Sequence, residues 1–135
     1  IFASNDEEKK LKAAIEWSKW EAATSNLNYK ESQITEFTDP KFALGFAQIE
    51  NHYFVNKGFF EYENQLLDGV DDIRHIPCAI IQGRYDIVCP ISSAWELSMK
   101  WPEAEFKVAK NSGHSAFENE IAKNLIQYTD KFSET

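Results

Sequence analysis

Basic residues and long apolar runs are both scarce in this sequence of 135 residues. Lysine and arginine total 14 against 22 acidic residues, which gives a formal net charge of −8. A surface that binds a phosphate backbone is normally basic, so this balance argues against nucleic acid and against anionic membrane surfaces. No apolar run approaches the roughly 18 residues of a membrane-spanning helix. We therefore expect neither nucleic acid nor a membrane as a partner.

Cysteine is also scarce, since Cys78 and Cys89 are the only two. They show neither CxxC spacing nor a nearby histidine pair, so they form no metal-binding motif. We expect both to be reduced packing residues, which fits a cytoplasmic location. The sequence begins at Ile1 without the features of a signal peptide, a start that is typical of a truncated fragment.

The composition is nevertheless that of a folded chain. Hydrophobic residues make up 43% and aromatic residues 14%, which is too apolar for a disordered segment. No internal repeat or low-complexity tract interrupts the sequence. A chain of this length can bury the core of one ordinary domain.

The first half of the sequence predicts helices. Ser4 and Glu7 have the spacing of a capping box, in which two side chains satisfy each other's exposed backbone donors, and a helix then runs to about Ala23. The polar stretch of residues 25–38 predicts a loop. Asp39 followed by Pro40 predicts a second helix start. One apolar stripe follows on that helix: Phe42, Phe46, Ile49 and Tyr53.

The second half changes its periodicity. After a third predicted helix over residues 66–73, residues 78–82 form a short apolar run, typical of a strand buried on both faces of a parallel sheet. Residues 105–109 alternate as a second strand. Predicted helices begin at Pro90 and, after a turn at residues 111–113, near the end of the chain. The order strand, helix, strand, helix predicts parallel pairing and an α/β architecture.

Polar motifs follow both predicted strands. Asp86 closes a Gly-Arg-Tyr-Asp motif after the first strand, and His114 lies in a Gly-His-Ser motif after the second. Sites in parallel sheets form at the carboxyl ends of the strands, where the loops converge. A serine hydrolase needs a base for the nucleophile's proton and a carboxylate that orients the base. Asp86 and His114 occur in the order of the acid and histidine of an α/β-hydrolase triad.

Taken singly, these residues have ordinary alternatives. Asp86 fits a turn residue or helix cap, and His114 fits a loop histidine without a role. Their joint placement at matched strand ends favours the triad. Glu118 is expected to cap or anchor the final helix.

Longer segments extend this pattern to one family. Residues 76–90, 94–97 and 101–105 resemble the acid-bearing region of the proline iminopeptidases, and residues 113–118 resemble their histidine segment. The segments Trp-Ser-Lys-Trp-Glu at residues 17–21 and Phe-Ala-Leu-Gly-Phe-Ala-Gln-Ile-Glu-Asn-His-Tyr-Phe at residues 42–54 resemble their helical cap. The likeness covers nearly the whole chain and is weakest over residues 26–38.

The resemblance implies a fold and a division of the chain. It implies the C-terminal part of an α/β-hydrolase parallel sheet, with the first strands absent. Residues 1–72 would form a helical cap segment, and residues 73–135 would supply the C-terminal strands and helices of the core.

The resemblance also implies an activity. This family removes an N-terminal proline from peptides through a serine acyl-enzyme, without a metal or cofactor. Asp86 would orient His114, which would act as general base and then acid. Glu21 and Glu50 would bind the terminal amine of the peptide, because a desolvated ammonium needs a carboxylate partner. The alternative is that both glutamates lie on solvated helix faces.

The nucleophile itself is missing from the sequence. Neither a GxSxG elbow nor an HGGG-like oxyanion loop occurs. We therefore expect this chain alone to be inactive, and to self-associate or pair with the missing N-terminal part through the open edge of the first strand. Two alternatives stay open: another α/β-hydrolase, such as an esterase or epoxide hydrolase, and a non-catalytic α/β binding module.

Overall fold

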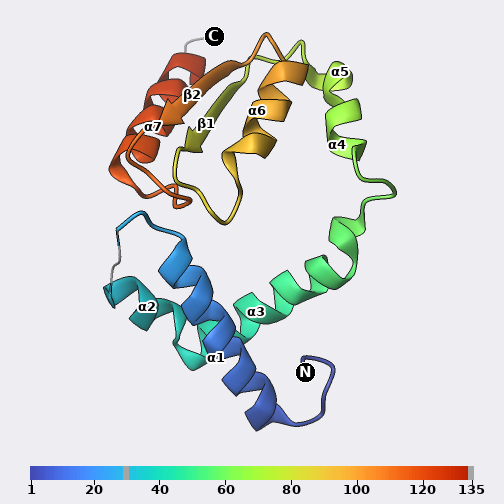
Figure 1. The fold of residues 1–135 in the computed structure, drawn as a ribbon, viewed down its shortest axis with the longest axis vertical. Coiled ribbons are helices and arrows are strands. Elements are labelled where there is room, and N and C mark those ends of the chain that lie inside the picture. The colour runs from blue at the N-terminus through green and yellow to red at the C-terminus, as the bar shows by residue number, and fades with distance from the viewer. Residues whose placement is uncertain (29–30, 134–135) are drawn as a thin grey trace. The chain divides into compact units, whose positions relative to one another are not determined.

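The computed structural model describes residues 1–28 and 31–133, which form two compact units (Figure 1). The helical unit comprises Ile1–Thr24 and Asn28–Glu61. The sheet unit comprises Ser25–Leu27 and Tyr62–Thr135.

Small residues form the centre of the helical unit. Its elements are α1 (Glu7–Thr24), α2 (Glu31–Phe37), α3 (Pro40–Val55) and the short 3₁₀ helix η1 (Lys57–Phe59). Ala14 of α1 and Ala43 and Ala47 of α3 are fully buried where these two helices pack. Alanine at the contact lets two helix backbones approach closely, and larger side chains close the edges of the contact. The partly buried apolar residues around it are Phe2, Ile15, Trp17 and Leu44.

Two of the predicted helix starts can be compared with the structure. Asp39 caps α3 as predicted, because its Oδ1 accepts hydrogen bonds from Lys41 N at 3.1 Å and Phe42 N at 3.0 Å. The capping box at the start of α1 was wrong. Asp6 caps this helix by accepting a hydrogen bond from Lys9 N at 3.0 Å, and Ser4 Oγ accepts from Asp6 N instead. An aspartate nearer the first turn displaced the serine as the capping acceptor.

The predicted loop over residues 25–38 was also wrong in part, because α2 occupies Glu31–Phe37. Residues 29 and 30 of that prediction lie outside the described residues. Phe37 explains why the short helix forms, since its ring lies 5.0 Å from that of Phe42 and 5.6 Å from that of Phe46. Burial of aromatic surface outweighed the polar composition of the segment.

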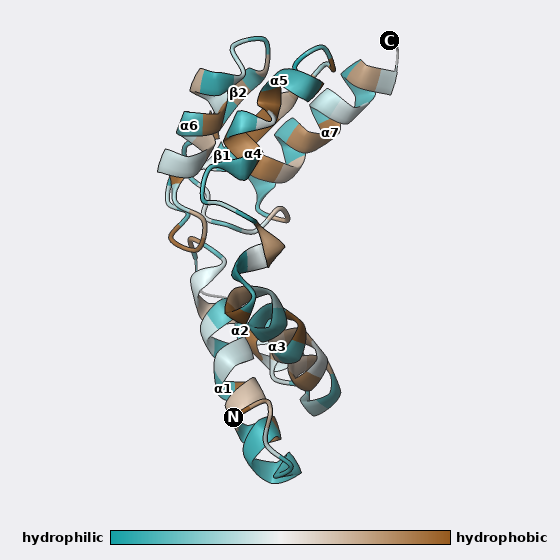
Figure 2. Cartoon of the chain, turned by 90° about the vertical axis from the view of Figure 1, so that its right-hand side faces the viewer, coloured by the Kyte–Doolittle hydropathy of each residue, from teal (hydrophilic) through white to brown (hydrophobic). Residues whose placement is uncertain are grey.

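The predicted stripe on α3 faces mostly outward within its unit. Phe42, Ile49 and Tyr53 are exposed, whereas Ala43 and Ala47 are buried. Figure 2 shows hydrophobic segments, in brown, along α3. The sequence predicted the apolar stripe but not which face of the helix is buried. The close approach of α1 selected the smallest side chains for that face.

The sheet unit is a parallel strand pair with helices. Its elements are α4 (Gln65–Asp68), α5 (Val70–Ile73), β1 (Ala79–Gly83), α6 (Ile91–Lys100), β2 (Glu105–Ala109) and α7 (Asn119–Ser133). The strands pair in parallel, with Ala79 opposite Glu105 and Gly83 opposite Ala109, so both end at the same edge. The predicted strands, their pairing, and the helices α6 and α7 are confirmed, while the third predicted helix is split into α4 and α5.

The burial predicted for the first strand was wrong in this chain. Residues 79–82 of β1 are only half-buried, and Gly83 alone is buried. Helices α6 and α7 both contact β1, but among the described residues its one paired neighbour is β2. The strand thus has the apolar composition of a central strand without the coverage of one.

Side-chain hydrogen bonds tie the outer elements of the sheet unit to the strands. Tyr128 of α7 donates a hydrogen bond to Glu105 Oε2 at 2.9 Å, and Lys131 pairs with the other oxygen of the same carboxylate. Arg74, just after α5, binds Glu103 before β2. No helix within residues 1–28 and 31–133 combines the length and apolar composition needed to cross a membrane.

Candidate active site

The loops that follow β1 and β2 are joined by backbone contacts. Arg84 N donates a hydrogen bond to Ala109 O at 2.9 Å, and Tyr85 N donates to Ser112 O at 3.0 Å. A Cβ atom on Gly83 would lie 1.8 Å from the carbonyl oxygen of Gly113. Only glycine allows this approach at position 83, so Gly83 helps to bring the two loops together.

The aspartate and the histidine of these loops form a hydrogen bond. His114 Nδ1 lies 3.0 Å from Asp86 Oδ2, although the two residues are 28 positions apart in the chain. This distance falls within the range of roughly 2.6–3.2 Å that a triad requires, and both residues lie at one edge of the parallel strands. The Asp86 side chain is 6% exposed and the His114 side chain 38% exposed. The acid is therefore buried behind a ring that solvent or a ligand can reach.

Asp86 is fixed by its own loop. Its Oδ1 accepts hydrogen bonds from Val88 N at 3.0 Å and Cys89 N at 2.8 Å, as in an Asx turn. Its Oδ2 accepts from the side-chain amide of Gln82 at 3.0 Å, in addition to its contact with His114. Three donors besides the histidine hold the carboxylate. Asp86 is therefore a turn residue, as the alternative proposed, and also the hydrogen-bond partner of the His114 ring.

The orientation of His114 follows from that contact. A carboxylate accepts hydrogen bonds and cannot donate, so a neutral ring beside it carries its proton on Nδ1. The other ring nitrogen, Nε2, is then the basic one. This arrangement can take a proton from a hydroxyl placed near Nε2 and stabilise the resulting positive charge.

The backbone of the histidine loop is held by the segment that follows α1. His114 N and Ser115 N both donate to Ser25 O, at 3.0 Å and 2.8 Å. The sequence offered no sign of this role, because Ser25 lies in a polar stretch far away along the chain.

Glu118 supports the same loop rather than the final helix alone. Its Oε1 accepts hydrogen bonds from Gly113 N and from Leu27 N, each at 2.9 Å. The expectation was that Glu118 caps or anchors the final helix, and the anchoring role is confirmed, because this carboxylate ties the start of α7 to the loop. The backbone carbonyl of Glu118 does accept from Ala122 N at the start of that helix, but its carboxylate turns back to the loop.

The predicted amine-binding residues lie in the helical unit. Glu50 on α3 is half-buried, and its Oε2 accepts a hydrogen bond from the indole Nε1 of Trp17 at 2.7 Å. The Trp17 ring also stacks on Phe54, with centroids 6.0 Å apart. Glu21 is half-buried one helical turn after Trp17 on α1, and residues four apart share a helix face.

The four predicted site residues therefore form two groups, one in each unit. Asp86 and His114 are bonded in the sheet unit, and Glu50 is bonded in the helical unit to the tryptophan that precedes Glu21. A common cavity for the two groups stays a prediction.

In the described part of the chain, no group of three or more His, Cys, Asp or Glu side chains is arranged to hold a metal ion.

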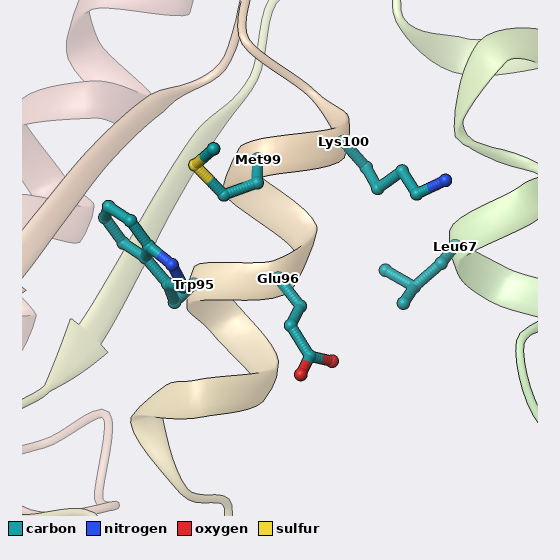
Figure 3. A pocket seen from close by; sticks show the side chains of 5 residues that line it. All are labelled: Leu67, Trp95, Glu96, Met99 and Lys100. Atoms are coloured by element: carbon teal, nitrogen blue, oxygen red, sulfur yellow. The ribbon is translucent and has the colours of Figure 1, made fainter.

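A cavity of about 370 Å³ lies elsewhere in the sheet unit (Figure 3). It is lined by five residues of α4 and α6: Leu67, Trp95, Glu96, Met99 and Lys100. None of them belongs to the predicted site. It carries no catalytic assignment.

The parallel strands and their helices make the sheet unit an α/β structure. No family model matches the chain. The chain is nevertheless 52% identical over 132 residues to a proline iminopeptidase of Xanthomonas citri, an alignment that covers 98% of this chain and 42% of the relative. It is 50% identical over 128 residues to a proline iminopeptidase of Arabidopsis thaliana, covering 95% of this chain and 34% of that protein.

A more distant relative extends the same match. The chain is 43% identical over 127 residues to the proline iminopeptidase of Neisseria gonorrhoeae, covering 94% of this chain and 39% of the relative. The chain is thus related to the proline iminopeptidases over nearly its whole length, which confirms the resemblance of its motifs. It spans about two fifths of the length of the first of these relatives.

Proposed function

We propose that this chain is the C-terminal part of a serine-type proline iminopeptidase of the α/β-hydrolase fold. The intact enzyme hydrolyses the bond that follows an N-terminal proline. The observation that carries this proposal is the 52% identity to a proline iminopeptidase across 98% of the chain. The 3.0 Å contact between Asp86 and His114 supports it, because the chemistry needs such a pair.

Asp86 and His114 supply proton transfer in this proposal. His114 Nε2 takes the proton of a serine hydroxyl as the serine attacks the prolyl carbonyl, and later gives it to the leaving amine. Asp86 holds the ring in the required tautomer and stabilises its protonated form. The serine and the oxyanion hole come from a part of the enzyme that this sequence does not contain, and no metal or cofactor is required.

Glu50 and Glu21 bind the terminal ammonium of the substrate in this proposal. Trp17 occupies one acceptor position of the Glu50 carboxylate, and a carboxylate offers about four. The indole therefore orients the carboxylate while leaving acceptor capacity for an ammonium. Aromatic rings near it would supply an apolar wall for the pyrrolidine ring. The partner in this proposal is a peptide with an N-terminal proline, and the proposed setting is the cytoplasm.

The open edge of β1 is the place where this chain would pair with the rest of the enzyme. Among the described residues, β1 has β2 on one side and no strand on the other. An uncovered edge of alternating donors and acceptors is a template for another strand. We expect the isolated chain to self-associate or to bind the missing N-terminal part through this edge. A monodisperse monomer by light scattering would contradict this expectation.

The activity is tested on the longer polypeptide that contains this chain. We expect it to release proline from a prolyl anilide and from a peptide with N-terminal proline. Replacing His114 with alanine should reduce kcat by about 10⁴-fold or more, because the nucleophile loses its base. Hydrolysis of simple esters without any release of proline would contradict the proposed substrate class. An active His114→Ala variant would contradict the proposed machinery.

A further inference from the structure

We infer that Gln82 is a positioning residue for the acid of this site, holding the Asp86 carboxylate in the orientation that His114 uses. The inference rests on the proposed function for its consequence in catalysis, but its structural part stands on hydrogen bonds within the sheet unit. Neither the motifs nor the resemblance assigns a role to this glutamine.

The first observation is that the Gln82 amide bridges the acid loop. Its Nε2 lies 3.0 Å from Asp86 Oδ2 and 3.0 Å from Cys89 O. A carboxylate and a carbonyl can only accept, so the nitrogen of the amide must face them rather than its oxygen. Both amide hydrogens are thus directed into the loop. Through them the Gln82 side chain, near the end of β1, links Asp86 to Cys89 further along the loop.

The second observation concerns the oxygen that Gln82 contacts. Asp86 Oδ1 is already held by the backbone of residues 88 and 89, whereas Oδ2 faces the histidine. Backbone donors on Oδ1 locate one end of the carboxylate, and rotation about that end would still move Oδ2. The amide of Gln82 adds a second fixed donor, on Oδ2, and so fixes the plane of the carboxylate relative to the His114 ring.

The third observation is the charge of the residue. A lysine or arginine in this place would neutralise the carboxylate that has to stabilise the imidazolium. The neutral amide donates hydrogen bonds and leaves the net negative charge of Asp86 in place. Glutamine therefore orients the acid while preserving the charge that the histidine needs.

The test replaces Gln82 with methionine, which keeps the length of the side chain and removes both donors. In the longer enzyme we expect kcat for a prolyl anilide to fall about tenfold to a hundredfold, as for loss of a hydrogen bond to a charged group, with KM within about twofold. In the chain described here, ¹⁵N shifts of the His114 ring should move away from those of a pure Nδ1–H tautomer. The matched control is Gln127→Met on α7, an exposed glutamine, which should leave kcat and the ring shifts unchanged.

The conservative variant separates positioning from packing. Gln82→Glu keeps the shape but places two carboxylates together, so its kcat loss should exceed that of Gln82→Met. A Gln82→Met protein that folds like the control, keeps its kcat and keeps the parental His114 shifts would overturn the inference. The ring shifts decide this even if the longer protein proves not to cleave prolyl substrates, since they do not depend on the reaction.

A measurement on the unmodified chain covers the case in which both variants fail to fold. The side-chain amide protons of Gln82 should exchange with solvent at least about tenfold more slowly than those of Gln127, because the two amide protons of Gln82 are hydrogen-bonded. Equal exchange rates would overturn the inference.

Discussion

The sheet unit and the helical unit hold their candidate site residues in different ways. Asp86 receives its supporting hydrogen bonds from within its own loop and from the strand end just before it. Glu50 is held by Trp17, which lies 33 positions away on a different helix. The first kind of support survives as long as one short loop keeps its conformation. The second depends on how α1 packs against α3, so it can change with that packing.

After loss of His114 itself, the largest effect should come from the acid of the sheet unit. Asp86→Asn keeps the shape but puts an amide NH₂ in place of one carboxylate oxygen. With Oδ1 still held by the backbone, the new NH₂ would face His114 and favour the wrong ring tautomer. We expect kcat of the intact enzyme to fall about 10³- to 10⁴-fold with little change in folding. Steady-state kinetics with a prolyl anilide measure this, and a loss below about tenfold would contradict the role of Asp86.

The helical unit should show a smaller and substrate-selective effect. Glu50→Gln keeps an acceptor for the Trp17 indole, so the packing of α1 on α3 is preserved, but it removes the charge. Cleavage of prolyl substrates should fall roughly 30- to 1,000-fold in kcat/KM, or about 2–4 kcal/mol. A neutral ester without the terminal amine should be hydrolysed nearly as well as by the parent. Equal losses of kcat/KM on both substrates would mean that Glu50 does not bind the terminal amine of the substrate.

The support of the histidine loop should appear mainly in stability. Glu118→Ala leaves Gly113 N and Leu27 N without their acceptor. Gly113 is buried whereas Leu27 is exposed, so the main cost is that of the Gly113 donor, and a buried donor without a partner costs about 1–3 kcal/mol. Glu118→Gln keeps an acceptor oxygen and should lose less. Urea unfolding of the chain measures both free energies. A larger loss for glutamine than for alanine would contradict the hydrogen-bonding role of this side chain.

The smallest effect should be a pH dependence of the sheet unit. Hydrogen bonds from the backbone of Asn111 and then Lys110 lower the pKa of the Glu120 carboxyl below its ordinary value of 4.5. A carboxyl with a lower pKa in the folded state stabilises the fold above its unfolded pKa, and this stabilisation is lost as the pH falls through the folded value. The Tm should therefore fall below about pH 4.5, less steeply in Glu120→Gln.

The control for this measurement is Glu63→Gln, the same substitution at an exposed position of the same unit. It should follow the parental pH profile. If Glu120→Gln and Glu63→Gln change the profile equally, the Glu120 hydrogen bonds contribute nothing specific to the loop.

The sequence predicted the two units unequally well. In the sheet unit, the bounds of the second strand and the parallel pairing were predicted correctly, and so was the hydrogen bond between Asp86 and His114. In the helical unit, the start of α3 at Asp39 was predicted correctly, but the cap of α1 and the helix α2 were not, and the buried face of α3 was not predicted. Strand ends with polar motifs are local signals, whereas the buried face of a helix depends on its neighbour.

The sequence by itself determined the pairing of acid and histidine. Two apolar runs joined by one helix favour parallel strands that end at the same edge, and each motif directly follows its run. The tertiary structure alone decided which residues hold that pair. Gln82, Ser25 and Glu118 reach it through hydrogen bonds, and no periodicity or motif records such bonds. Their partners are chosen by the path of the chain in space, which follows from packing over the whole unit rather than from the order of neighbouring residues.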